Sequence, residues 1–183
     1  MNNAGTRGTP PLPTAVSAGD FRHAVSRFAT GITVVTSEGA DCIRGMTCNS
    51  FTSVSLDPAT ILVSLKPGKS HAAIASSGRF GVSVLRDEHQ AFSTYFSGRT
   101  AGGEAPEFVV RHEIPTLKHC LAWFECEVAR AVPIHDHTVF VAQVVACGTD
   151  DGAPLVFFDS HYHVSSPMPV NRLPERDRSP SAS

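Results

Sequence analysis

The sequence has no closely spaced cysteine pair. Its cysteines are odd in number and widely separated, at Cys42, Cys48, Cys120, Cys126 and Cys147. An odd count without a CxxC motif argues against both a disulfide framework and a structural zinc site. We therefore expect free thiols, buried as small apolar residues in the reducing environment of the cytoplasm.

Long hydrophobic runs and a strong charge of one sign are also absent. No apolar stretch approaches the roughly 20 residues that span a bilayer. Residues 1–19 lack the basic start and apolar centre of a signal peptide. The formal net charge of −2 gives no electrostatic attraction for nucleic acid or an anionic membrane. These absences favour a soluble cytoplasmic protein with neither nucleic acid nor a membrane as its partner.

Familiar signatures of catalysis and nucleotide binding are missing too. There is no GxGxxG after a strand, no Walker loop, no GxSxG elbow and no HExxH. A nicotinamide or flavin, if bound, is therefore not bound in the manner of a Rossmann fold. His135 with His137, and His161 with His163, have the i, i+2 spacing that could chelate a metal on a strand. Neither pair has a third ligand at fixed spacing, so a metal barrel is the least favoured alternative.

Short segments rich in β-branched residues dominate the remainder of the chain. Its 183 residues suffice for one domain with a hydrophobic core. We expect a helix at 21–29, with Asp20 as its N-cap and Gly31 closing it, a short helix capped by Ser70, and a helix at 87–97. Strands are expected at 32–36, 43–56, 61–65, 79–85, 121–132, 138–147 and 155–158. This pattern predicts a mainly β protein, a compact barrel or sandwich with few short helices.

Composition sets the expected domain boundaries. Residues 1–18 are rich in Pro, Gly, Thr and Ala and predict a flexible arm. Prolines and charges predict a disordered tail at 165–183, which leaves one domain at 19–164. Within this domain, the Gly-rich stretch 98–107 is long enough to suggest a lid or a ligand edge.

Two segments have the composition of a binding site. Residues 45–58 are crowded with small hydroxyl, amide and thiol side chains, which supply donors and acceptors without filling space. Such an edge could recognise a flat heteroaromatic ring, and an ordinary strand with a polar solvent face is the alternative. Residues 66–70 open a helix, and its free N–H groups beside Lys66 and Lys69 could hold a phosphate. A solvated turn with two lysines is the alternative there.

These segments resemble, in the same order, those of the short-chain flavin reductases. The matching runs are FRHAVSRFATGITVVT at 21–36, GMTCNSFTSVSLDP at 45–58, FGVSVL at 80–85, the Asp136-His137 turn and PLVFF at 154–158. The likeness covers about residues 20–164. It implies an FMN-binding split β-barrel of Greek-key type with a few short flanking helices. It also implies a homodimeric enzyme that reduces free FMN or FAD with NADH or NADPH and supplies a separate flavin-dependent monooxygenase.

The resemblance also implies roles for individual residues. Residues 47–50 would contact the flavin ring, partly through backbone groups. Residues 64–66 with Lys69 and Ser70 would hold its ribityl phosphate, His137 would bind the nicotinamide, and segment 158–162 would close the pocket. His135 stands where the family has glycine. Hydride transfer between the cofactors requires no protein acid or base, so no catalytic residue and no metal ligand is expected. The expected cofactor-binding residues are Met46, Thr47, Cys48, Asn49, Ser50, Ser64, Leu65, Lys66, Lys69, Ser70, His137, Phe158 and Tyr162.

Two further alternatives follow from the same fold. A split-barrel protein could bind flavin or haem without reductase activity, or an oxidase could retain a tightly bound flavin. The thiol of Cys48, where the family commonly has alanine, is not expected to be catalytic in any of them. An assay that follows NADH oxidation with free flavin separates these alternatives.

Overall fold

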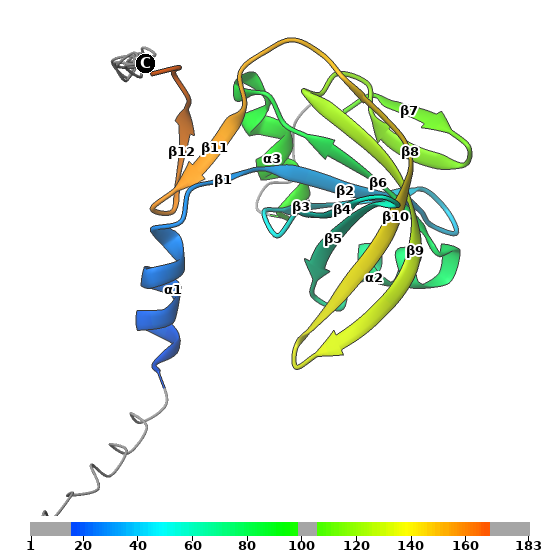
Figure 1. Cartoon of the computed structure of the whole chain (residues 1–183), viewed down its shortest axis with the longest axis horizontal. Coiled ribbons are helices and arrows are strands. Elements are labelled where there is room, and N and C mark those ends of the chain that lie inside the picture. The colour runs from blue at the N-terminus through cyan, green and yellow to red at the C-terminus, as the bar shows by residue number, and fades with distance from the viewer. Residues whose placement is uncertain (1–15, 99–105, 169–183) are drawn as a thin grey trace, which may run out of the picture.

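The chain is built mainly of β-strands, and the computed structural model describes residues 16–98 and 106–168 (Figure 1). Most of the predicted arm and tail, and residues 99–105 of the Gly-rich stretch predicted at 98–107, lie outside these ranges. The helical elements are α1 (Ala18–Ser26), α2 (Lys69–Ser77), η1 (Asp87–His89, a 3₁₀ turn) and α3 (Gln90–Phe96). The strands are β1 (Thr30–Gly31), β2 (Thr33–Glu38), β3 (Ile43–Cys48), β4 (Thr52–Leu56), β5 (Ala59–Leu65), β6 (Arg79–Val84), β7 (Phe108–Arg111), β8 (Ile114–Leu117), β9 (Ala122–Ile134), β10 (His137–Thr149), β11 (Leu155–Phe158) and β12 (His161–Val164). No helix within the described ranges is long and apolar enough to cross a bilayer.

Seven antiparallel strands form one curved sheet in the order β3-β2-β6-β9-β10-β5-β4 (Figure 1). The two edge strands, β3 and β4, follow each other in the chain and are joined by residues 49–51. From this connection the Ser50 hydroxyl reaches β5, where it accepts from the Ser64 N–H at 2.8 Å and donates to the Ser64 carbonyl at 2.9 Å. The β3 edge of the sheet is therefore linked to β5 by the Ser50 side chain, and not by backbone pairing of the two strands. The predicted mainly β split barrel is confirmed.

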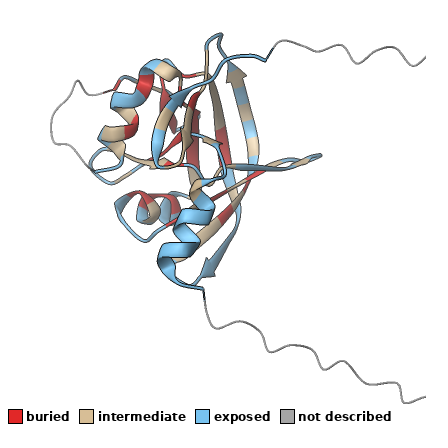
Figure 2. Ribbon diagram, turned by 90° about the vertical axis from the view of Figure 1, so that its left-hand side faces the viewer, coloured by how far each residue is buried: buried red, intermediate tan, exposed pale blue. Residues whose placement is uncertain are grey.

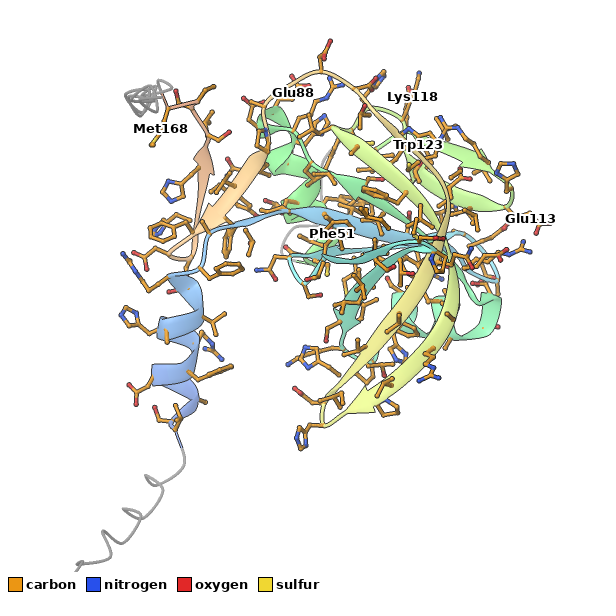
Figure 3. The ribbon with its side chains drawn as sticks, in the orientation of Figure 1. Phe51, Glu88, Glu113, Lys118, Trp123 and Met168 are labelled. Atoms are coloured by element: carbon orange, nitrogen blue, oxygen red, sulfur yellow. The ribbon has the colours of Figure 1, made fainter. Side chains whose placement is uncertain are left out.

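Side chains that alternate inward along the strands fill the barrel. Phe80, Phe140 and Val63 are at most 1% exposed, and Phe51 packs on Phe124 with ring centroids 5.4 Å apart (Figure 3). Burial of each such side chain contributes about 1.5–3 kcal/mol. Helix α2 packs on the same cluster and beside β3, which fixes the position of its first turn.

A small second sheet, with the order β1-β11-β12, lies beside the barrel (Figure 1). Ile32, Leu85 and Leu155 are buried together where this sheet meets the barrel strands. Helix α1 precedes β1 and extends away from the barrel, and none of its residues is buried (Figure 2). Phe21 of this helix, at 63% exposure, and Phe28 just after it, at 75% exposure, are large apolar side chains at the surface.

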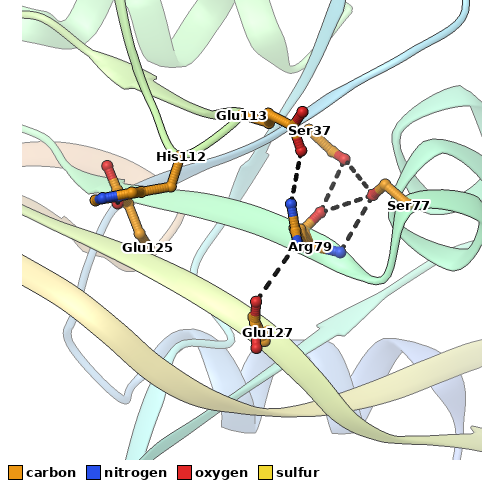
Figure 4. Close-up of polar contacts among 7 residues, drawn as sticks. All are labelled: Ser37, Ser77, Arg79, His112, Glu113, Glu125 and Glu127. Atoms are coloured by element: carbon orange, nitrogen blue, oxygen red, sulfur yellow. Dashed lines mark hydrogen bonds and ion pairs between the residues drawn. The ribbon is translucent and has the colours of Figure 1, made fainter.

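A hairpin of β7 and β8 covers strands β2 and β6. Gly81 permits this close packing, because a Cβ there would collide with the carbonyl oxygen of Pro115. At the hairpin tip Glu113 forms a 2.7 Å ion pair with Arg79, which also lies 3.5 Å from Glu127 of β9 (Figure 4). The hairpin is thus held both by buried strand packing and by a surface ion-pair network.

Three predicted helix caps are wrong. Helix α1 is capped by Ser17, which has the extended backbone of an N-cap and accepts from the Asp20 N–H at 3.0 Å. Gly31 lies in β1 rather than at the end of the helix. Helix α2 is capped by Gly68, and no side chain hydrogen-bonds to its first turn. Ser70 is not the cap, because it already lies inside the first turn and is buried.

The strand predictions were incomplete in three places. The predicted strand 43–56 is two strands, because the chain leaves the sheet at 49–51. The β7–β8 hairpin was missed because its turn places His112 and Glu113, not glycine, at positive φ (47° and 64°). Strand β12 was missed because it is only four residues long, HYHV, and contains a single β-branched residue.

Candidate functional site

Three hollows around β3 join into a single groove. The inner slot, about 180 Å³, is lined by residues of β3, α3, β11 and β12. The turn hollow, about 300 Å³, is lined by β3, the 49–51 connection, β5 and the β9–β10 turn. The helix hollow, about 400 Å³, is lined by β3, the start of α2 and the end of α3. All three include Thr47, so a ligand could extend from one to the next.

The groove brings together eleven of the thirteen expected residues. They come from four separate stretches of the chain, which the barrel places side by side. They are Met46, Thr47, Cys48, Asn49, Ser50, Ser64, Lys66, Lys69, Ser70, His137 and Tyr162.

The other two expected residues point elsewhere. The Leu65 side chain is fully buried in the barrel core. The ring of Phe158 lies under the Arg27 guanidinium, 4.6 Å from it, and beside the ring of His163. The neighbouring Phe157 lines the inner slot instead, because successive side chains of a strand point to opposite faces.

The backbone of β3 forms one side of the groove. This strand is the edge of the barrel sheet and pairs only with β2 within the described residues. An edge strand presents unpaired N–H and C=O groups, which can bind the polar edge of a planar ligand. At Gly45 a Cβ would stand 2.5 Å from the ring of Phe96, so the glycine makes room for α3 rather than for a ligand.

The hydroxyl groups of this segment are largely occupied within the protein. Thr47 Oγ1 donates to the Ser93 carbonyl at 2.7 Å. Ser50 is committed to β5, and its Oγ also lies 2.9 Å from the Cys48 thiol. Recognition of a ring along β3 therefore falls mainly to the backbone and to Asn49, whose side chain makes no hydrogen bond among the described residues.

The first turn of α2 provides an anion site at the end of the groove. Its cap, Gly68, has an extended backbone (φ 172°) and makes no side-chain hydrogen bond to the helix. The first N–H groups of a helix lack intrahelical partners and carry the positive end of its dipole. Lys66 and Lys69 line the same hollow. A phosphate placed here would meet donors and two cations together.

The β9–β10 turn places His137 in the lining of the turn hollow, together with Lys66 and residues of β3. Its Nδ1 donates to Asp136 Oδ1 at 2.8 Å, and Lys66 Nζ lies 3.2 Å from the second carboxylate oxygen. The hydrogen bond from His137, with a smaller effect of Lys66, lowers the pKa of Asp136. The carboxylate thus orients both the imidazole of His137 and the ammonium group of Lys66, and the imidazole Nε2 remains available to a ligand.

The same turn contains His135, at the position where the resemblance to the flavin reductases implies a glycine. His135 has φ 50°, in the left-handed region that glycine adopts most easily. Histidine is one of the non-glycine residues enriched there. The turn therefore keeps a glycine-type backbone despite the substitution.

Several groove residues were not expected from the sequence. Ser93, Ser97 and Phe96 come from α3 and the residue that follows it, and Phe157 comes from β11. The alternation of residues 155–158 could have indicated Phe157. Nothing in the sequence marks the two serines, because their role arises only when α3 packs on β3.

The residues present fit a flavin. An open strand edge suits the polar rim of a flat ring, the aromatic side chains of Phe157 and Tyr162 suit its apolar part, and the cationic helix start suits a phosphate. The fold and groove together define the class, a split-barrel flavin-binding protein.

Comparison with known proteins gives the same class and places the chain in a family. Residues 25–166 match the family model described as flavin reductase like domain. The chain belongs to this family, as the sequence predicted. The match covers the barrel and the small sheet, including every groove residue named above.

The relatives are flavin reductases. The NADH-dependent flavin reductase StyB of Pseudomonas fluorescens is 49% identical over 156 residues, which are 82% of this chain and 91% of that protein. The styrene monooxygenase flavin reductase SMOB of Pseudomonas putida S12 superimposes with a TM-score of 0.77 at 49% identity, covering 82% of this chain and 99% of that one. The flavin reductase PheA2 superimposes with a TM-score of 0.80 at 33% identity, covering 83% and 100%. The predicted enzyme class, a nicotinamide-dependent flavin reductase, is confirmed.

Proposed function

We propose that this protein reduces free FMN or FAD with NADH or NADPH and releases the reduced flavin to a separate monooxygenase. One observation carries the proposal. A single groove combines a strand edge for a flat ring, a cationic helix start for a phosphate, and a histidine oriented by a carboxylate.

The chain contributes alignment and shielding. Bound flavin and nicotinamide supply the redox chemistry, the transfer of a hydride from one ring to the other. The β3 edge holds one ring in place, and His137 orients the second ring beside it. Holding the reacting rings in contact is a proximity effect that needs no protein acid or base. Phe157 and Tyr162 exclude water from the inner slot.

The lysines act on the phosphate side. Lys69, at the start of α2, neutralises the phosphate of the flavin. Lys66 is shared between the helix hollow and the turn hollow, and its ion pair with Asp136 links the phosphate site to the His137 turn. The flavin phosphate and the nicotinamide are thereby bound by residues that also contact one another, Lys66, Asp136 and His137.

We further propose a homodimer in the cytoplasm. Phe21, Val25 and Phe28, on and just after α1, are 51–75% exposed, and such apolar surface favours association with a second copy. The Pseudomonas putida relative is a styrene monooxygenase flavin reductase, which supports a separate oxygenase as partner. Free cysteines at all five positions suit a reducing compartment.

The direct test is an assay of NADH oxidation by the purified protein. NADH absorbance should fall when FMN or FAD is added, and should stay constant without flavin. Flavin fluorescence should also be quenched on titration with protein. Flavin binding without NADH or NADPH oxidation would instead support a binding protein of the same fold.

A further inference from the structure

We propose that Ser93 of α3 is a positioning residue that fixes both sides of the inner slot. The inference rests on the flavin reductase function proposed above. Ser93 is completely buried and lines the slot together with residues of β3, β11 and β12. Burial and the absence of charge make it unsuited to chemistry, but well placed to hold its neighbours.

Ser93 contacts the β3 side through its main chain. Its carbonyl oxygen accepts a hydrogen bond from Thr47 Oγ1 at 2.7 Å. The proton of the Thr47 hydroxyl is thereby directed to α3, and only its lone pairs remain for a ligand. Thr47 lines all three hollows, so its orientation matters along the whole groove.

Ser93 contacts the opposite side through its side chain. Its Oγ lies 2.9 Å from the Tyr162 hydroxyl of β12. Among the described residues this is the only hydrogen bond that a β12 side chain makes outside the small sheet and its connecting turn. The Tyr162 ring also packs edge-on against Phe157, with centroids 5.5 Å apart. Ser93 therefore fixes the outer end of an aromatic pair that forms one side of the slot.

Loss of the Ser93–Tyr162 hydrogen bond should affect flavin affinity more than the rate of hydride transfer. Strand β12 is the edge of a small sheet, and without the Ser93 bond the tyrosine could adopt several positions. Binding of a ring beside Tyr162 would then include the entropic cost of ordering this side chain, which weakens affinity. Once the ring is bound, the rate of hydride transfer should change little.

The bond can be removed from either side with small changes. Ser93→Ala deletes the Oγ but retains the carbonyl that holds Thr47. Tyr162→Phe deletes the phenol hydroxyl but retains the ring. Each variant, and the double variant, is titrated with FMN by fluorescence quenching and assayed for KM and kcat. Thr94→Ala is the matched control, because Thr94 lies on the same helix, does not line the inner slot, and its hydroxyl bonds only to the Gln90 carbonyl within that helix.

We expect each single variant to raise the Kd for FMN about fivefold, the effect of one hydrogen bond. The double variant should have a Kd for FMN no higher than that of the weaker-binding single variant, because both substitutions remove the same bond. In all three variants kcat at saturating flavin should stay within about twofold of the wild-type value. Thr94→Ala should have the wild-type Kd and kcat. Additive losses of affinity, unchanged affinity, or a fall in kcat at unchanged Kd would each overturn the role of Ser93. If the wild type binds FMN but oxidises no NADH, the reductase function fails, while the titration still decides the role of Ser93.

Discussion

Individual hydroxyl groups in the groove act differently from what the sequence indicates. The density of Ser and Thr along 45–58 predicts direct recognition by side chains. Thr47 and Ser50 instead hold α3 and β5 in place. A ligand would therefore meet mainly the backbone N–H and C=O groups of β3 and the side chain of Asn49. The Cys48 thiol is likewise buried and lies 2.9 Å from Ser50 Oγ.

His137 is expected to act on the nicotinamide. Replacing it by alanine should raise KM for NADH about five- to tenfold, the effect of one charge-assisted hydrogen bond, and should leave the FMN Kd within about twofold. Asp136→Asn should raise KM for NADH by less, because the ring loses its orientation but remains present. Steady-state kinetics with flavin titration measures both. A larger effect on FMN than on NADH would contradict this role.

Cys126 makes folding stability depend on alkaline pH. Burial, with a smaller contribution from the neighbouring Glu125, raises the pKa of its thiol to about 12. Above the unfolded pKa of about 8.5 the unfolded chain releases a proton that the folded chain keeps, so stability falls as pH rises. This group alone should cost about 1 kcal/mol per pH unit between about pH 9 and 11. Urea unfolding of wild type and Cys126→Ala should show a shallower fall in the variant, and equal slopes would disprove the assignment.

Among the elements, α2 carries the phosphate site through its first turn. Lys69→Glu should raise the Kd for FMN at least about tenfold, because it replaces attraction by repulsion beside the phosphate. Riboflavin, which lacks the phosphate, should bind within about twofold of its wild-type Kd. Lys118→Glu, the control, changes the net charge equally but lies at the upper rim of the barrel (Figure 3) and outside the groove. Equal losses for FMN and riboflavin would place the phosphate elsewhere.

The β7–β8 hairpin depends on the close approach of β6. Gly81→Ala would push a methyl group into the Pro115 carbonyl and the Thr116 side chain. The free energy of unfolding should fall by about 3 kcal/mol, as for severe overpacking. Gly31→Ala is the control, since no atom lies within 4 Å of a Cβ there. Similar urea midpoints for both variants would show that the hairpin does not pack as described.

Prediction from sequence succeeded where a pattern is local. The β-branched runs, the turn at Asp136-His137 and the basic start of α2 each have a short signature, and the family resemblance ordered them correctly. It failed where tertiary contacts decide. The β7–β8 hairpin has no turn glycine, and Ser93 becomes part of the groove only because α3 packs against β3.

For the molecule as a whole, the exposed helix α1 is the main feature that one chain leaves unexplained. Its apolar side chains Phe21 and Val25, and Phe28 just after it, are 51–75% exposed. We expect a homodimer, so light scattering should give twice 19.5 kDa. The double variant Phe21→Ser/Phe28→Ser should shift this mass toward the monomer at micromolar concentration. A wild-type monomer, or an unaffected dimer in the variant, would show that α1 is not the interface.

The central claim is that β3 and the start of α2 hold one flavin between them. The most direct measurement is a crystal structure of the protein with FMN bound. The account predicts the ring along residues 46–50, with its phosphate at the first turn of α2 within hydrogen-bonding distance of Lys69. FMN bound elsewhere on the barrel, with this groove filled only by solvent, would contradict it.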